Sequence, residues 1–178
     1  NDNLNLTDDL VNYVDPFIGT GGHGHTYPGA SQPFGMLQPS PDNGISGWDW
    51  CSGYHTSSDT IAGFSQLHLS GTGIGDLADI LFMPVTKDIE LGTKWNSSKD
   101  IPYSSSFSQD TETAFPGYYS VFLDEPQVKV ELTTLDRTAY HKYKFQSDSN
   151  QSVILDLGFA INWDSPTDTQ ITIESSTL

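Results

Sequence analysis

The sequence predicts an all-β fold, an antiparallel β-sandwich with long loops rich in glycine and proline. Three observations predict it. Apolar and polar residues alternate with a period of two over several short segments, as they do on half-buried strands. From about residue 117 these segments recur at roughly the 8–12-residue spacing that is typical of sandwiches. No segment shows the period of a helix of ordinary length.

The chain begins with a polar lead-in over residues 1–12, and we expect one domain over residues 13–178. Within the lead-in, Thr7 is a candidate N-cap for a single helical turn. Glycine and proline recur every few residues between Tyr13 and Gly53, which excludes a long helix there. We expect ordered loops and short strands in that stretch, with one strand at Phe34–Gln38.

The strand patterns become stronger further along the chain. Asp79–Val85 and Gly117–Leu123 are largely apolar runs that predict buried strands. Three alternating segments predict a meander: Gln127–Leu132, Ala139–Phe145 and Gln151–Leu157. A last alternation at Gln170–Glu174 predicts one more strand, and such a strand normally pairs with a later one. We therefore expect the domain to be incomplete at its C-terminus.

Charge and composition exclude several classes of function. Acidic residues outnumber basic ones 23 to 7, so the net charge of −16 argues against binding to nucleic acid or to an anionic membrane surface. The single cysteine, Cys51, excludes an intramolecular disulfide and a cysteine-based zinc site. No apolar run approaches the ~20 residues of a membrane span, so we expect no membrane insertion. Many aromatic residues and few Lys or Arg residues are typical of a secreted, carbohydrate-type protein.

The first candidate site is a glycine-rich stretch. Gly19–Gly24 matches the pattern G-x-G-x-x-G, but Pro28 and Gly29 follow too soon for the helix that a dinucleotide site requires. The glycines build either a tight loop that approaches a ligand or a plain turn. His23 and His25 could ligate a metal, hydrogen-bond a ligand or stabilise the loop itself.

The second candidate site is Trp48-Asp49-Trp50. Sugar rings stack on aromatic faces, and a neighbouring carboxylate can accept hydrogen bonds from vicinal hydroxyl groups. The alternative is that one or both tryptophans fill the core. Asp76 and Asp79 could form the carboxylate pair of a glycosidase, although Asp beside Gly is also ordinary turn chemistry.

Several of these stretches together resemble the family 92 glycoside hydrolases, which are calcium-dependent, exo-acting α-mannosidases. The stretch Val14–Ser31 resembles the opening motif of the family. The resemblance continues through Pro33–Met36, Gly53–His55, Gly63–Ser65, His68–Gly73, Asp79–Leu81 with Met83–Pro84, and Pro116–Val121. The sequence departs from the family at Gln66-Leu67, where a His-Thr pair often stands.

The resemblance implies the N-terminal β-sandwich lobe of a two-domain enzyme whose catalytic (α/α)6 barrel is absent from this chain. The family removes terminal α-mannose with inversion, using a Glu acid, an Asp base and a calcium ion. Because those carboxylates and most calcium ligands belong to the barrel, the resemblance implies a hydrolase whose catalytic residues lie outside this chain. The implied partners are mannose-containing glycans and the C-terminal catalytic domain. The implied location is secreted, periplasmic or at the cell surface.

The resemblance also implies a set of substrate contacts, because loops of the N-terminal lobe close one side of the mannose pocket in this family. That role falls to Gly21, Gly22 and His25 in the first loop, and to Trp48, Asp49 and Trp50 in the second. We expect Trp50 to stack on the sugar, and we assign no metal ligand to this chain. The alternative function is a stand-alone carbohydrate-binding module.

Overall fold

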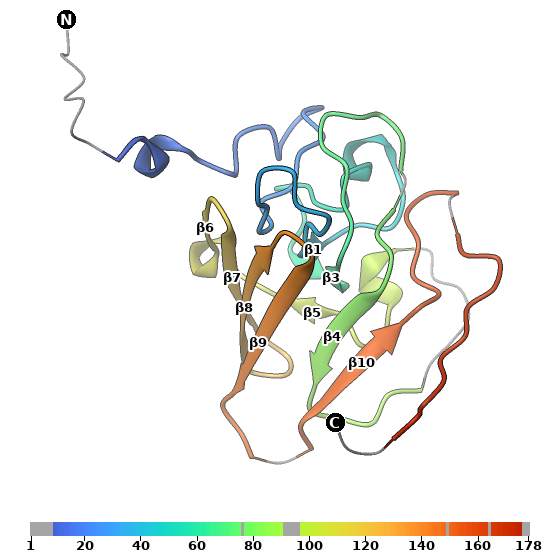
Figure 1. Cartoon of the computed structure of the whole chain (residues 1–178). Coiled ribbons are helices and arrows are strands. Elements are labelled where there is room, and N and C mark those ends of the chain that lie inside the picture. Colours follow the sequence, from blue (N-terminus) through green and yellow to red (C-terminus); the bar gives the residue numbers. More distant parts are fainter. Residues whose placement is uncertain (1–8, 76, 91–96, 149, 164, 176–178) are drawn as a thin grey trace, which may run out of the picture.

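Strand β8 (Val128–Leu135) shows how the alternation in the sequence becomes a two-faced strand. In the computed structural model its side chains are alternately buried and accessible, with Val128, Val130 and Leu132 fully buried. It pairs antiparallel with β7 (Tyr118–Leu123) on one side and β9 (Thr138–Phe145) on the other. With β6 (Thr113–Phe115) these strands form a sheet in the order β6-β7-β8-β9 (Figure 1).

The structure describes residues 9–75, 77–90, 97–148, 150–163 and 165–175. The second sheet has the order β1-β3-β4-β10. Its strands are β1 (Ser40–Asp42), β3 (Gly63–Ser65), β4 (Leu81–Val85) and β10 (Ser152–Asp156). A small third sheet pairs β2 (Thr60–Ile61) with β5 (Ser105–Ser106). All of these pairings are antiparallel.

Helical structure in the described part of the chain is limited to short 3-10 turns: η1 (Leu10–Tyr13), η2 (Trp48–Trp50), η3 (Ser98–Asp100) and η4 (Gln109–Thr111). None of the helices in that part of the chain has the length and apolar character needed to cross a bilayer. One core joins the two larger sheets, with Phe64, Leu81 and Met83 from one and Tyr119 and Val121 from the other. The all-β fold predicted from the sequence is confirmed.

Three details of the strand prediction are wrong. Phe34–Gln38 is not a strand, because Gly35 N donates to Gln32 O and Phe34 has a left-handed φ of +62°, which close a turn. Strand β10 does not complete a meander with β9; it pairs with β4, from Ser152 opposite Val85 to Asp156 opposite Leu81. The stretch Gln170–Glu174 is not a strand, because it forms no ladder with any described strand, and Ile171 and Ile173 are exposed.

The helical turn near the N-terminus is confirmed as η1, with a different cap. Asp9 is its N-cap, and the Asp9 carboxylate accepts a hydrogen bond from Val11 N at 3.3 Å. The predicted cap, Thr7, lies outside the described residues.

A cavity of about 510 Å³ lies where β9 approaches β4 and β10, and His141 is the histidine in its wall. His141 Nε2 lies 3.1 Å from Gln66 Oε1, and Nδ1 lies 2.8 Å from the Tyr143 hydroxyl. An amide oxygen only accepts, so Nε2 carries the proton and Nδ1 accepts from Tyr143. Burial lowers the pKa of His141 to about 4, so the ring is neutral at pH 7 and Nδ1 is free to accept.

This depressed pKa predicts a loss of stability in acid. Below about pH 6.5 the unfolded chain binds a proton at His141 that the folded chain does not, so stability falls until the pH reaches about 4, by roughly 3 kcal/mol in all. Urea unfolding of the parent and His141→Gln at pH 7 and near pH 4.5 measures this, and the variant should lose less stability on acidification. The exposed Lys144→Gln on the same strand should keep the dependence of the parent. Equal acid losses in parent and His141→Gln would contradict the assignment.

Candidate functional site

Three loops meet at one end of the sheets, above β1, β3 and β4 in Figure 1. We call them the first loop (residues 14–30), the second loop (43–59) and the third loop (66–80, of which 76 is not described). Backbone hydrogen bonds join them: Thr56 N donates to Thr20 O at 2.9 Å, and Gly71 N donates to His25 O at 2.6 Å. All six substrate contacts expected from the sequence lie in the first two loops.

Gly21 and Gly22 lie where the first loop meets the second. A Cβ on Gly21 would lie 2.9 Å from Thr56 Cγ2, so the approach of the two loops requires a small residue here. Gly22 has a φ of +58° and open space around its Cα, so a side chain would strain the backbone rather than meet a neighbour. Its carbonyl oxygen lies 3.1 Å from His55 Nε2. The first loop therefore presents backbone to the solvent at Gly22.

His25 is buried, with only 6% of its surface exposed, and its φ is +53°. The carbonyl oxygen of His25 accepts hydrogen bonds from the Ser52 hydroxyl and from Gly71 N, each at 2.6 Å, which joins all three loops. The imidazole stands edge-on to the ring of Trp48, with centroids 4.8 Å apart. Nε2 of His25 is buried and has no hydrogen-bond partner among the described residues. Buried polar atoms in folded proteins are nearly always hydrogen-bonded, so we expect a hydrogen-bond partner for this nitrogen that is not among the described residues.

Trp48 and Trp50, on η2, have different environments. Trp48 is 59% exposed, and a Cβ on Gly73 of the third loop would overlap its ring. Trp50 is partly buried: a Cβ on Gly44 would overlap its indole, and its ring centroid lies 5.2 Å from that of His55. Neither ring belongs to the hydrophobic core that joins the sheets, so both remain available at the loop end.

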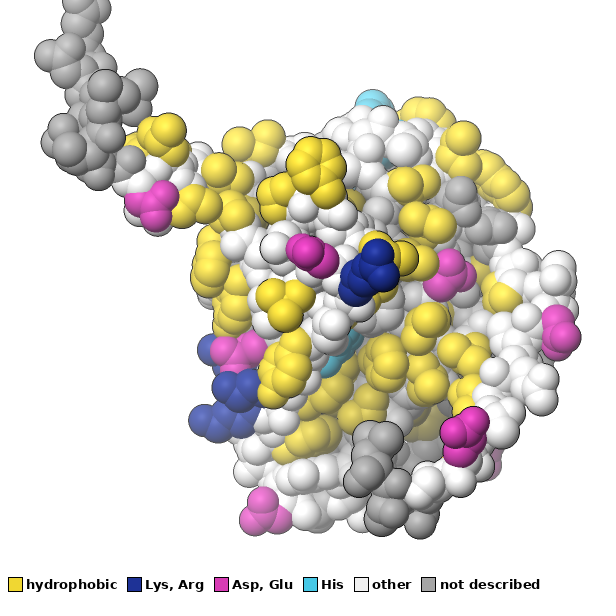
Figure 2. Space-filling view, viewed as in Figure 1, with side chains coloured by type: hydrophobic (Ala, Val, Ile, Leu, Met, Phe, Trp, Pro, Cys, Tyr) yellow, Lys and Arg dark blue, Asp and Glu magenta, His cyan; other side chains and the backbone are white. Residues whose placement is uncertain are grey.

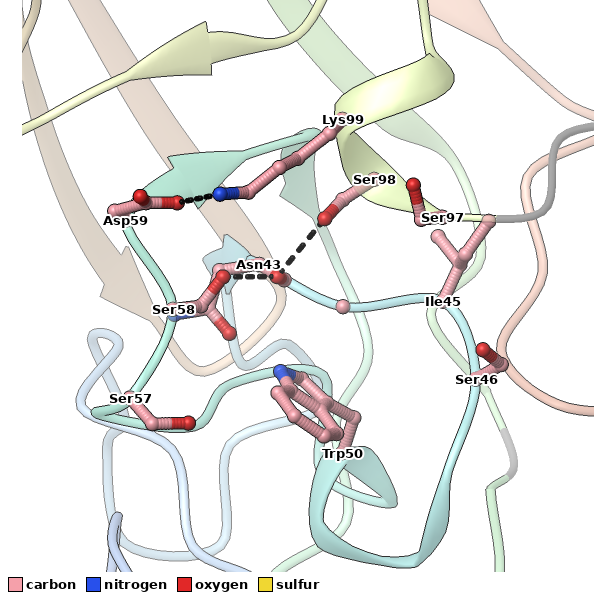
Figure 3. Close-up of a pocket in the computed structure, with 11 residues that line it drawn as sticks. Asn43, Ile45, Ser46, Trp50, Ser57, Ser58, Asp59, Ser97, Ser98 and Lys99 are labelled. Carbon is pink, nitrogen blue, oxygen red and sulfur yellow. Dashed lines mark hydrogen bonds and ion pairs between the residues drawn. The ribbon is translucent and has the colours of Figure 1, made fainter.

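Trp50 also lines a polar cavity of about 300 Å³ (Figure 3). The Asn43 carbonyl oxygen in its wall accepts hydrogen bonds from the Ser58 and Ser98 hydroxyls, at 2.7 and 3.2 Å. The Lys99 ammonium and the Asp59 carboxylate form an ion pair at 2.7 Å beside it. The indole N–H of Trp50 is buried without a hydrogen-bond acceptor among the described residues. A buried donor without an acceptor destabilises the folded domain, and a ligand that supplies an acceptor would remove this cost.

Asp49 faces the first loop. Its Oδ1 lies 2.5 Å from Nδ1 of His23, whose side chain is largely exposed. This contact holds the second loop against the first and leaves Asp49 Oδ2 as an acceptor. His23 thus joins the site as the partner of Asp49, a pairing that the sequence did not predict.

A buried contact between a histidine and an aspartate supports the three loops. His68 Nε2 lies 3.1 Å from Asp42 Oδ1, and both side chains are almost completely buried. His68 Nδ1 faces the Gln38 carbonyl oxygen at 2.8 Å, and Asp42 Oδ2 accepts from Ser65 N at 2.8 Å. The ring of Tyr27, from the first loop, packs beside His68 at 5.2 Å. The pair thus fixes the end of β1 and the starts of the second and third loops.

Comparison with known families decides the identity of the domain. Residues 13–178 match the family described as the glycosyl hydrolase family 92 N-terminal domain. This chain belongs to that family. The family 92 resemblance drawn from the sequence is therefore confirmed.

Solved family 92 structures resemble most of this chain. A family 92 α-mannosidase from Bacteroides thetaiotaomicron, solved in complex with mannoimidazole, is 39% identical with a TM-score of 0.81, over 87% of this chain and 20% of that one. A family 92 inverting mannosidase from the same organism is 29% identical with a TM-score of 0.69, over 84% of this chain and 20% of that one. An uncharacterised secreted glycosidase of the fungus Arthroderma benhamiae is 29% identical over 81% of this chain. This chain spans about a fifth of the length of these relatives.

The carboxylates of this family 92 domain form no metal site in the described residues. No three His, Cys, Asp or Glu side chains gather there in an arrangement that could hold an ion. His23 and His25 do not converge, since one is exposed and the other buried.

Other acidic residues do not form an evident acid–base pair. Asp76 lies outside the described residues, so the Asp76–Asp79 pair is not described either. Glu112 is largely buried, and its two oxygens accept hydrogen bonds from the Tyr54 and Tyr119 hydroxyls at 2.8 and 2.6 Å. Burial raises the pKa of Glu112 above its ordinary value. Because both oxygens are occupied, Glu112 is a structural carboxylate under the second loop.

Sequence reasoning missed several residues that shape this end of the domain. Asp59 and Lys99 pair across 40 positions beside the cavity. Asn162 holds the second loop, since its Oδ1 accepts from Gly47 N at 2.7 Å and its own N donates to Ile45 O at 2.8 Å. No local sequence motif identifies these residues, because their contacts join segments that are far apart in the sequence.

Proposed function

We propose that this chain is the N-terminal domain of an inverting, exo-acting α-mannosidase of the α-1,2-mannosidase type, and that its loop end forms one side of the mannose pocket. The observation that carries the proposal is the Trp48-Asp49-Trp50 turn, which presents aromatic rings, a carboxylate and an unsatisfied N–H at one end of the fold. Sugar hydroxyl groups supply the acceptors and donors that these groups lack, and pyranose C–H faces suit the rings.

Each candidate residue has a role in this proposal. Trp50 stacks on the sugar and its N–H donates to a hydroxyl oxygen, while Asp49 Oδ2 accepts from a hydroxyl group. His25 Nε2 meets either the sugar or the catalytic part of the enzyme. Gly21 and Gly22 let the first loop approach the ligand with backbone alone. The exposure of Trp48 supports the rival assignment, in which Trp48 is the stacking ring.

The chemistry belongs to groups outside this chain. Inversion needs two carboxyl groups about 6.5–9.5 Å apart, with a water molecule between them and the sugar. We propose that both carboxyl groups, and the calcium ion that the family resemblance implies, lie in the C-terminal catalytic domain. The described residues bind and orient the terminal mannose, and they exclude water from one side of it. By itself the chain is inactive.

The proposed partners are mannose-containing glycans and the catalytic domain of the same protein. The proposed location is outside the cytoplasm, by secretion, in the periplasm or at the cell surface. The name of the fungal relative, a secreted glycosidase, supports this location.

The second candidate function is a stand-alone carbohydrate-binding module, which the exposed ring of Trp48 favours. Titration calorimetry of the purified chain with methyl α-mannoside separates the two. Half a pocket should bind with a Kd above roughly 10 mM, because ordering a ligand costs free energy that few contacts offset. A submillimolar Kd that is lost in Trp48→Ala would favour the module.

A further inference from the structure

One aromatic side chain on the described surface is placed entirely in solvent. Phe34 is 106% exposed, more than any other large hydrophobic side chain described. Met36 and Leu135, which are also exposed, lie on neighbouring segments, since Met36 N donates to the carbonyl oxygen of Asp136. In Figure 2, hydrophobic side chains are spread over much of the visible face, including its loop-bearing end. We call the segment Gln32–Met36 the Phe34 loop.

The backbone of the Phe34 loop is fixed in an unfavourable conformation. Phe34 has a φ of +62°, which a residue with a Cβ adopts at a cost in free energy. Hydrogen bonds hold the loop on both sides: Gly35 N to Gln32 O at 2.9 Å, Met36 N to Asp136 O at 2.7 Å, and Gln38 Nε2 to Gly35 O at 3.0 Å. The exposed ring is therefore presented on a rigid support rather than on a loose tail.

In the part of the domain that the structure describes, the Phe34 ring itself does not compensate for that cost. An exposed ring removes no apolar surface from water, so it does not stabilise the fold. Glycine at position 34 would adopt the same φ without strain. A rigid, strained and fully exposed phenylalanine is thus unfavourable for the chain alone, and it is favourable when a partner buries the ring.

We infer that the Phe34 loop is the anchor by which this domain docks on the rest of its own polypeptide, with the ring of Phe34 in an apolar pocket of that part. This inference rests on the proposed function, because it takes the partner to be the remainder of a family 92 enzyme. About four fifths of each solved relative lies outside the region that this chain matches. The Phe34 loop also stands at the same end as the candidate site, where the proposed pocket needs its second side (Figure 1).

Two other occupants fit the surface less well. A second copy of this chain would bring together two bodies that each carry a charge of −16, which opposes association. A glycan fits less well, because the ring stands beside the exposed apolar residues Met36 and Leu135, while the exposed charged residues Asp136 and Arg137 follow on the neighbouring segment. An apolar centre with a charged rim is typical of a protein interface. A protein pocket is the occupant that an apolar anchor suits.

The two methionines of the chain provide a direct test. Met36 is 61% exposed on the Phe34 loop, and Met83 is 0% exposed in the core. Hydrogen peroxide should oxidise Met36 at least about tenfold faster than Met83 in the isolated chain, as followed by peptide mass spectrometry. In the longer protein that carries the catalytic part, the Met36 rate should fall at least about tenfold, while Met83 stays slow and reports that the fold is intact. An unchanged Met36 rate in the longer protein would overturn the inference.

Phe34→Gly tests the anchor itself. The isolated variant should unfold at the same temperature as the parent or at a higher one, because the strain is relieved. In the longer protein the variant should regain a large part of the fast Met36 oxidation, whereas the exposed control Ile173→Ala should not. Full protection of Met36 in Phe34→Gly would show that the ring is no anchor. Protection in the isolated chain, with a doubled mass by light scattering, would assign the surface to a dimer and overturn the inference.

The inference and the proposed function fail separately. If the longer protein is an active mannosidase but its Met36 is still oxidised rapidly, the inference is wrong and the proposed function stands. If the longer protein protects Met36 from oxidation but releases no mannose, the proposed function is wrong and the inference stands.

Discussion

Replacing Trp50 with alanine, in a protein that joins this domain to its catalytic part, should lower kcat/KM for an aryl α-mannoside by roughly 10–100-fold. The loss combines the stacking surface with the hydrogen bond of an N–H that has no acceptor among the described residues. Steady-state kinetics measures it, and the unfolding midpoint of the same variant shows that the fold persists. Phe115→Ala, an exposed aromatic on β6, is the control and should keep the parent rate. An unchanged rate in Trp50→Ala would refute the stacking role.

Trp50→Phe separates the two contributions. Phenylalanine keeps a ring but removes the buried donor, so the isolated chain should be as stable as the parent or more stable. The rate of the joined protein should nevertheless fall, by about tenfold, because a substrate hydroxyl loses its donor. If the rate falls instead in Trp48→Ala and not in either Trp50 variant, Trp48 is the stacking ring.

Removing Asp42 should have the largest effect on stability. Asp42→Ala leaves the His68 ring buried without its carboxylate and leaves Ser65 N without an acceptor, so we expect a loss of about 3–5 kcal/mol in the free energy of unfolding. Urea unfolding of the isolated chain measures this. The exposed pair Lys99–Asp59 is the matched control, since Asp59→Ala should cost about 1 kcal/mol or less.

A double variant tests whether Asp42 and His68 act as a pair. Asp42→Asn with His68→Gln replaces both partners together, so it should be less destabilising than the sum of the two single changes. Strict additivity would mean that the two side chains contribute independently and that their contact does not support the loops.

The sequence predicted best those strands in which apolar and polar residues alternate, because the alternation determines which face of the strand is buried. Val128, Val130 and Leu132 alternate with Lys129 and Glu131, and the alternation fixes which side of β8 is buried. The same pattern says nothing about which strand lies alongside. The sequence order suggested that β10 follows β9, whereas β10 pairs with β4 in the other sheet.

The errors at Phe34 and Ile171 have a different cause. An apolar run predicts burial, but Phe34 and Ile171 are exposed. At Phe34 the turn is set by a left-handed φ and by hydrogen bonds to Gln32 and Asp136, neither of which is visible in residue type. At exposed apolar residues of the described surface, the burial that the sequence pattern predicts does not agree with the exposure in the structure. Such positions are candidates for contact with another domain or molecule.

Part of the candidate site could be predicted because its residue types are unusual locally. Two tryptophans around an aspartate, and a run of glycines, mark these loops as candidates for ligand contact in the sequence itself. The contacts that shape the site could not be predicted in the same way. The pairing of Asp49 with His23, and the unsatisfied nitrogens of His25 and Trp50, depend on how distant loops pack.

The central claim is that this domain shapes a mannose pocket but holds neither the acid nor the base. Hydrolysis of an aryl α-mannoside by the purified 178-residue chain, with and without added calcium, tests it most directly. We predict no turnover above the buffer rate in either condition, and turnover once the chain is joined to its catalytic part. Mannose release by the 178-residue chain alone would contradict the account, because it would place a catalytic pair within these residues.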